Sequence, residues 1–226
     1  MLNRIRSKFV QKFKERGDLY DERDKQRVIF DDNYVLKFIE IYKHDFEKAF
    51  AAIEETIRWR KSFGVNAINA DDFTEEFLGA LETRAYVRRD KEEDVVCVCF
   101  KWIDDKAEWV PIYHKFIVYL MEIMENRSVE YSKRWCLLFD RTHADIEFSE
   151  KSWNKFCVDN FLKRFPQCID YVEIYKIDWF WFFICKIIYF LAPSIFVSDF
   201  EILDESETKY FLGIEKGNNN AFTIEK

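Results

Sequence analysis

Hydrophobic residues recur every three or four positions in the N-terminal part of the chain, which is the spacing of one face of an α-helix. The pattern predicts a first helix whose apolar stripe consists of Leu2, Ile5, Phe9 and Phe13. Residues 21–30 and 31–43 predict two shorter helices, with Asp31 or Asp32 as the cap of the second.

A fourth helix is predicted after Asp45, which is a favourable N-cap residue, and it ends before Gly64, a typical C-terminal stop. Its apolar face consists of Phe46, Ala49, Phe50, Ile53 and Ile57. Together these elements predict a small helical bundle over residues 1–66.

Beyond Gly64 the pattern changes to short β-like runs that alternate with helical segments. Strands are predicted at residues 85–89, 95–102, 134–140, 171–177 and 197–203, and helices at residues 74–81, at 112–126 and from residue 149 onwards. This alternation indicates an α/β domain with a mostly parallel sheet flanked by helices, over residues 67–212. Residues 213–226 are predicted to form a polar tail, for which an ordered and a disordered state are both open alternatives.

Residues 179–197 are almost entirely apolar and lie between two predicted strands. A membrane span needs about 20 apolar residues, but Lys186 near the middle and the helix-breaking Pro193 both disfavour one. We expect instead a helix that covers an apolar cavity or fills a core.

Composition excludes several function classes. The formal net charge of −7 argues against a nucleic-acid binder, which would be net basic. The six cysteines are scattered without metal-ligand spacing, which indicates free thiols, no metal site and no cofactor. The N-terminal residues lack the apolar stretch of a secretory signal, so we expect a cytoplasmic protein.

The predicted N-terminal helix is basic as well as amphipathic. One interpretation is contact with anionic lipid headgroups, with the stripe entering the membrane interface. The other is that the stripe docks on the rest of the protein. The residues proposed for headgroup or membrane contact are Arg4, Arg6, Lys8, Lys12 and Lys43.

No catalytic constellation is recognisable. The three histidines, His44, His114 and His143, lie in no nucleophile elbow, zinc helix or phosphate loop, so we expect no enzyme. Glu122, Glu125 and Glu130 are most simply a charged helix face.

Several short motifs, taken in order, resemble those of the CRAL-TRIO family of lipid-binding proteins. Residues 33–63 are similar to the family's helical N-terminal part, which ends in Trp-Arg-Lys as Trp59-Arg60-Lys61 do here. Asp140 ends a strand as in the family, Phe165-Pro166-Gln167 resembles its Tyr-Pro-Glu, and residues 179–197 resemble its gate helix. Residues 20–35 and 90–96 are most similar to the motile sperm domain-containing subfamily of these proteins.

The resemblance implies a CRAL-TRIO-like fold with a hydrophobic pocket that a movable gate helix closes. Its lipid ligand, a phospholipid as leading candidate, would be carried between membranes or sensed, with peripheral attachment to intracellular membranes such as the endoplasmic reticulum. The alternative is a non-enzymatic scaffold or interaction module whose pocket is filled, with protein partners that the sequence does not name. The residues proposed to line the pocket and gate are Trp102, Tyr113, Phe116, Leu138, Trp153, Phe156, Phe161, Tyr175, Phe180, Phe183, Ile187 and Phe190.

The headgroup is where this sequence departs from the family. Members that bind phosphatidylinositol carry an Arg-Lys pair, a Glu and a Lys where this chain has Tyr42-Lys43, Gln167 and Asp199. An Asp in place of a Lys reverses the charge that would pair with a phosphate. The sequence therefore predicts a lipid site without naming the lipid.

Overall fold

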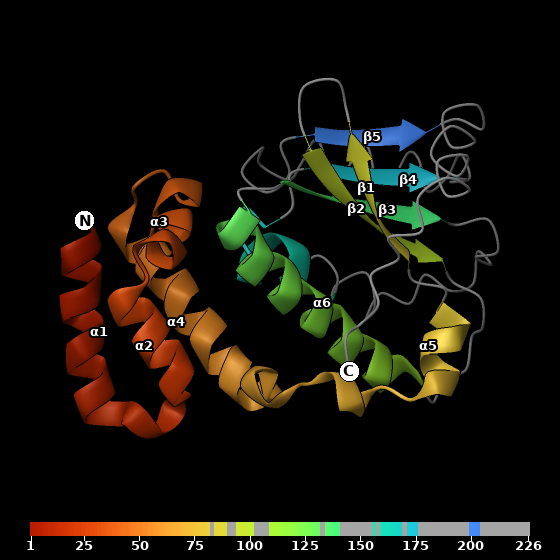
Figure 1. The fold of residues 1–226 in the computed structure, drawn as a ribbon. Helices are drawn as coiled ribbons and strands as arrows, with labels where there is room; N and C mark the ends of the chain where they lie inside the picture. The colour runs from red at the N-terminus through yellow and green to blue at the C-terminus, as the bar shows by residue number, and fades with distance from the viewer. Residues whose placement is uncertain are drawn as a thin grey trace.

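The structure is a computed structural model that describes residues 1–81, 84–89, 94–101, 109–131, 134–140, 156, 159–168, 171–175 and 199–203. Its N-terminal part is helical, as the sequence predicts (Figure 1). The elements are α1 (Leu2–Arg16), the 3-10 turn η1 (Gly17–Leu19), α2 (Glu22–Phe30), α3 (Asp32–Ile41) and α4 (Phe46–Phe63).

Side-chain caps define where these helices begin and end. Asp31 accepts a hydrogen bond from the backbone N–H of Tyr34 at 3.0 Å, and Asp45 accepts one from that of Lys48 at 3.1 Å. Gly64 follows α4 with a φ of 77°, a left-handed conformation that glycine adopts without steric cost. The predicted caps of α3 and α4 and the predicted stop at Gly64 are confirmed.

The four helices enclose their own hydrophobic core, here called the bundle core. The stripe of α1 belongs to it, because Ile5 and Phe9 are fully buried. Phe9 contacts Phe50 of α4, with ring centroids 4.4 Å apart. The other buried members are Tyr20, Val28, Tyr34, Val35, Phe38, Ile39, Ala49, Ile53 and Ile57.

The remainder of the chain combines helices with strands. The helical elements are η2 (Val65–Ala67), η3 (Ala70–Asp72), α5 (Glu75–Leu81), α6 (Val110–Tyr131) and the π-helical turn η6 (Asp159–Arg164). The helices predicted at residues 74–81 and 112–126 are confirmed as α5 and α6. The predicted gate segment lies outside the described residues, and of the helix predicted from residue 149 the structure describes residue 156 and residues 159–168.

The described strands form a five-stranded sheet in the order β1-β2-β3-β4-β5. β1 is antiparallel to β2, whereas each later neighbouring pair is parallel. Lys101, Asp140, Tyr175 and Leu203 are paired in register at the carboxyl ends of the parallel strands. The strands are β1 (Arg84–Arg89), β2 (Asp94–Lys101), β3 (Arg134–Asp140), β4 (Tyr171–Tyr175) and β5 (Asp199–Leu203).

α6 lies between the sheet and the N-terminal helices (Figure 1). It is therefore covered on more than one side, and its buried residues are not confined to the single face that the sequence suggested. Phe116 is buried as predicted, but Tyr119, Leu120 and Ile123 are only partly buried. The fully buried line also includes Ile117 and Met121, each about 1% exposed.

A second hydrophobic core, here called the domain core, surrounds α6. It consists of Val65, Phe73, Phe77, Tyr113, Phe116, Ile117, Val118, Met121, Met124, Phe165 and Cys168.

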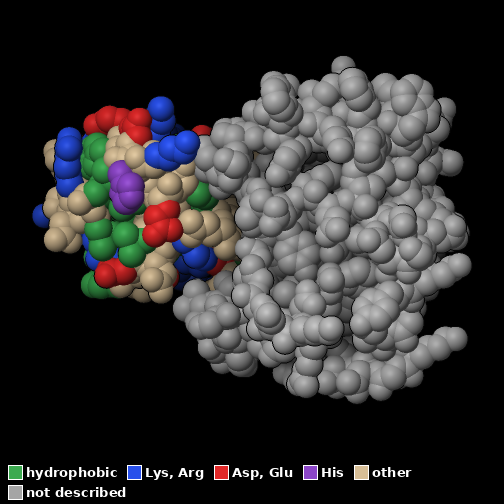
Figure 2. All heavy atoms as spheres, turned by 90° about the horizontal axis from the view of Figure 1, so that it is seen from above, with side chains coloured by type: hydrophobic (Ala, Val, Ile, Leu, Met, Phe, Trp, Pro, Cys, Tyr) green, Lys and Arg blue, Asp and Glu red, His purple; other side chains and the backbone are tan. Residues whose placement is uncertain are grey.

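The outer surface of the helical bundle carries hydrophobic, basic and acidic side chains side by side (Figure 2). None of the helices in the described part of the chain has both the length and the apolar character that a membrane span requires.

Candidate functional site

The predicted pocket residues fall into three groups. Trp102, Trp153, Phe180, Phe183, Ile187 and Phe190 lie outside the described residues. For Leu138, Phe161 and Tyr175 the structure describes the backbone, and Leu138 and Tyr175 pair in register with Glu173 and Asp140 respectively. These assignments stay predictions.

The third group, Tyr113, Phe116 and Phe156, is placed with side chains. Tyr113 and Phe116 are 5% and 0% exposed, and both contact the ring of Phe77 edge to face at centroid distances of 5.5 and 5.7 Å. The ring of Phe116 also meets Phe73 at 5.2 Å. These contacts place Tyr113 and Phe116 in a packed aromatic cluster on the α5 side of α6.

Phe156 lies on another side of α6. Its ring stacks on the imidazole of His114, with centroids 3.8 Å apart and planes at 11°. Its ring centroid also lies 6.2 Å from that of Phe63 in α4. Burial lowers the pKa of His114, which favours the neutral imidazole in this apolar contact.

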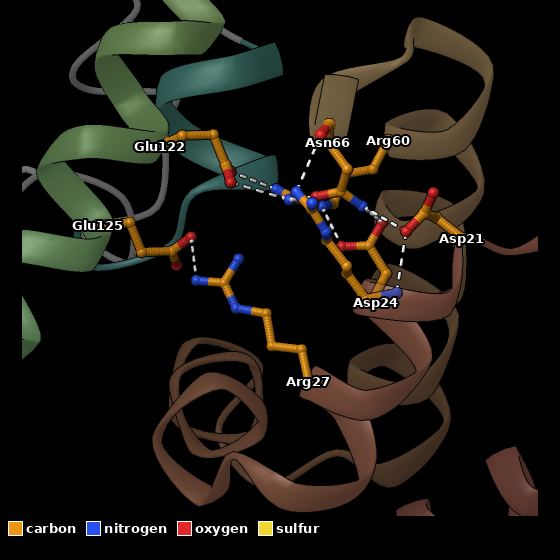
Figure 3. A network of polar contacts seen from close by, with 8 residues as sticks. Asp21, Asp24, Arg27, Arg60, Asn66, Glu122 and Glu125 are labelled. Carbon is orange, nitrogen blue, oxygen red and sulfur yellow. Dashed lines mark hydrogen bonds and ion pairs between the residues drawn. The ribbon is translucent and has the colours of Figure 1, made fainter. Parts of the chain in front are cut away.

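The most conspicuous polar feature is a layer of charged side chains between the bundle core and the domain core, here called the polar layer (Figure 3). Arg60 of α4 is its centre and is only 2% exposed. Its Nε donates to Oδ1 of Asp24 in α2 at 2.6 Å, and its Nη2 donates to Oε2 of Glu122 in α6 at 2.9 Å. A second nitrogen, Nη1, also contacts Glu122, so the pair is bidentate.

Asn66 completes the coordination of this arginine. Its Oδ1 accepts a hydrogen bond from Arg60 Nη2 at 3.1 Å, while its Nδ2 donates to Asp21 at 2.8 Å and to Asp24 at 3.0 Å. Burial raises the pKa of Asp24, an effect that Arg60 opposes. Burial alone would lower the pKa of Arg60, but its carboxylate partners outweigh burial and raise it, so the guanidinium stays charged.

A second ion cluster lies beside the first. Glu125 of α6 is 1% exposed, and its carboxylate pairs with Arg27 of α2 at 2.8 Å and with Lys37 of α3 at 3.6 Å. The Arg27 guanidinium also lies 4.5 Å from the ring centroid of Tyr34. The polar layer therefore connects α6 to three helices of the bundle.

One sequence interpretation is corrected here, and one residue of the polar layer was missed. Glu122 and Glu125 do not form a solvated helix face, because both are drawn into ion pairs with the bundle. From the sequence, Arg60 stands out only as part of the Trp59-Arg60-Lys61 resemblance. An available signal was the position of Arg60 three residues after Ile57, on the apolar face of its helix.

The basic residues of α1 have mostly intramolecular partners. The ion pairs are Arg6–Asp32 at 2.6 Å, Lys8–Glu47 at 3.1 Å and Lys12–Glu54 at 2.6 Å. Because the apolar stripe is buried in the bundle core, the docked alternative is the one that the structure shows. Contact of the basic side chains themselves with lipid stays a prediction.

Of the headgroup positions, Lys43 directly follows α3, and Gln167, in the turn after η6, contacts the last turn of α3. Lys43 is exposed, and the side-chain amide of Gln167 donates to the carboxylate of Glu40 at 2.9 Å. Lys43 and Gln167 have positive φ values of 50° and 55°. Asp199 is the first residue of β5 and pairs in register with Tyr171.

The helical bundle followed by an α/β domain defines the class of protein. The model of the CRAL/TRIO domain matches residues 86–216, which is more than half of the 226-residue chain. The chain therefore belongs to the CRAL/TRIO domain family, whose members bind lipid ligands.

A solved structure supports the fold. The crystal structure of Sfh5 is similar with a TM-score of 0.52 and 12% sequence identity, over 85% of this chain and 69% of that one. At this identity the likeness concerns the fold alone. It extends over more of the chain than the family match does.

Proposed function

We propose that this protein binds a hydrophobic lipid, with a phospholipid as the leading candidate, and carries it between membranes or senses it. The observation that carries the proposal is the match of residues 86–216 to the CRAL/TRIO domain. The apolar residues 179–197 fall inside that match, where a gate helix would close the lipid pocket.

The physical driving force would be burial of the acyl chains. Each Å² of apolar surface removed from water contributes about 25 cal/mol, so a few hundred Å² is enough to hold a lipid. Exchange then requires the gate to open against a membrane, which makes peripheral membrane contact part of the cycle. The proposal includes no catalytic step.

Transfer of a fluorescent phospholipid between donor and acceptor vesicles tests the proposal. We expect the wild-type protein to accelerate transfer, and Phe183→Asp to slow it because a charge is then placed on the predicted gate. Phe30→Asp is the matched control, since Phe30 is 79% exposed and lies on the bundle. Absence of transfer and of bound lipid in the wild-type protein would contradict the proposal.

A second candidate is a non-enzymatic scaffold that binds a membrane or a protein with its pocket filled. The specific observation in its favour is the tight packing of Tyr113 and Phe116 against Phe77. Side chains proposed for the pocket wall are thereby used in the domain core. The same transfer assay separates the two candidates, because a scaffold would move no lipid.

The assignment to the motile sperm domain-containing subfamily and attachment to the endoplasmic reticulum are parts of the proposal that rest on the sequence. Imaging of the tagged protein together with an endoplasmic reticulum marker tests the second.

A further inference from the structure

The turn between α3 and α4 gathers basic side chains from two distant parts of the sequence. α1 packs along α4 so that the Arg4 guanidinium lies 3.9 Å from the ring centroid of Phe46, and the Lys8 ammonium lies 5.1 Å from it. Phe46 is the first residue of α4, and Lys43 and His44 precede it in the turn. We call this surface the α3–α4 corner: Arg4, Lys8, Lys43, His44, Phe46 and Lys48.

Backbone hydrogen bonds close the turn. The N–H of Lys43 donates to the carbonyl oxygen of Glu40 at 2.9 Å, and that of His44 donates to the carbonyl oxygen of Ile39 at 2.8 Å. Both residues adopt left-handed φ values, 50° and 62°, in the hydrogen-bond pattern that ends many helices. Both are exposed, so a hydrogen-bonded turn presents a lysine and a histidine to solvent.

Charge favours an anionic occupant. The corner carries four cations, Arg4, Lys8, Lys43 and Lys48, and the carboxylates next to it in sequence are Glu40, Asp45 and Glu47. Lys8 pairs with Glu47 and Lys48 with Asp45, whereas within the described part of the chain Arg4 and Lys43 form no ion pair. A guanidinium held over an aromatic ring loses little further freedom on binding, and its outward edges can donate to phosphate oxygens.

The surface around Phe30, which is 79% exposed, lacks this character. Phe30 is directly followed by Asp31 and Asp32, whose carboxylates would repel anionic headgroups. Basic, acidic and hydrophobic groups are interspersed on the face of the bundle that Figure 2 shows, so the local excess at the corner matters more than the net charge of −7.

We propose that the α3–α4 corner is the surface by which the protein docks on anionic phospholipid membranes. The docking is electrostatic, through Arg4 and Lys43, and leaves the stripe of α1 buried in the bundle core. This inference deepens the proposed function, because lipid exchange requires contact with a membrane.

The test compares two charge-matched double variants in a vesicle co-sedimentation assay. Arg4→Gln with Lys43→Gln removes the two cations of the corner. Lys14→Gln with Arg58→Gln removes two exposed cations from the C-terminal parts of α1 and α4, so that both variants change the net charge equally. The vesicles are phosphatidylcholine with or without phosphatidylserine.

We expect the wild-type protein to bind only the vesicles with phosphatidylserine, and the corner variant to bind them about 30-fold more weakly. The distal variant should bind almost as the wild-type protein does. Equal losses in the two variants would mean that only net charge matters, and no loss in the corner variant, or no binding by the wild-type protein, would also overturn the proposal.

The docking proposal and the lipid-carriage proposal can be tested separately. Native mass spectrometry of the same variants reports bound lipid independently of vesicle binding. Vesicle binding without bound lipid would support membrane docking at the α3–α4 corner and refute lipid carriage. Bound lipid without vesicle binding by the wild-type protein would support lipid carriage and refute docking at the corner.

Discussion

Nη2 of Arg60 donates to Oε2 of Glu122 at 2.9 Å, and this contact joins the helical bundle to the α/β domain across 62 residues of sequence. The guanidinium is nearly inaccessible to water, and it also contacts Asp24. A buried ion pair adds little net stability compared with apolar residues, but removal of one partner leaves the other charge buried and uncompensated. The contact therefore positions α6 against the bundle.

Arg60→Leu should accordingly destabilise the protein by about 3 to 5 kcal/mol, because Asp24 loses its cation. Urea denaturation followed by circular dichroism measures the change. The exposed neighbour Arg58→Leu is the control, with an expected effect within about 0.5 kcal/mol. The double variant Arg60→Leu with Asp24→Leu should recover part of the loss, and a single variant as stable as the wild-type protein would disprove this role of the polar layer.

Any side chain at position 64 should lower the free energy of unfolding. Gly64→Ala adds a Cβ that meets nothing within 4 Å, so the expected loss of about 1 kcal/mol comes from the φ of 77° alone. Gly17 has a φ of −60°, and Gly17→Ala should leave the free energy of unfolding unchanged or raise it. Thermal unfolding of the two variants separates backbone strain from side-chain contacts.

The carboxylate of Glu54 holds α1 to α4, and its effect should depend on pH. Burial alone would raise its pKa, but hydrogen bonds from Lys12 and the Tyr20 hydroxyl outweigh burial and lower it. Because the folded pKa is lowered, the stabilisation is present above the unfolded value of about 4.3 and is lost as the pH falls through the folded pKa.

Glu54→Gln should thus lower the free energy of unfolding by about 1 kcal/mol at neutral pH. Denaturation curves at pH 7 and at pH 3 should show the difference from the wild-type protein shrinking at the lower pH. A constant difference would contradict the assigned ion pair. Glu55→Gln, an exposed neighbour with the same change of charge, should differ little from the wild-type protein at pH 7.

Phe116 should behave as a core residue. Phe116→Ala removes a fully buried ring and should cost about 3 to 5 kcal/mol, whereas Phe30→Ala at an exposed position should cost little. If Phe116→Ala were tolerated as well as Phe30→Ala, its ring would face open space and the pocket assignment of Phe116 would regain support. Chemical denaturation of both variants decides between the two.

Local features of this fold could be predicted from the sequence because they depend on residues close together in the chain. Asp45 and Gly64 mark the ends of α4 by their own conformational preferences, and the three- to four-residue spacing of Ile5 and Phe9 predicts a helix with one apolar face. Whether that face met a membrane or the protein depended on contacts that periodicity does not contain.

The polar layer could not be predicted in the same way. Glu122 and Glu125 are three residues apart on α6, which is also the spacing of a solvated charged face, and Arg27 pairs with Glu125 across 98 residues of sequence. Only the packing of α6 against the bundle distinguishes the two situations. The lipid pocket rests on the family resemblance and stays a prediction, and the resemblance names no headgroup, since Gln167 and Asp199 depart from the known patterns.

The most direct test of the central claim, that this protein carries a lipid, is native mass spectrometry of the wild-type chain purified from a eukaryotic lysate, with lipid analysis of whatever dissociates. The account predicts one lipid per chain, of a defined class, released on activation. A protein that retains only its bare-chain mass, from several preparations and under conditions that preserve its fold, would contradict lipid carriage and leave the scaffold as the better account.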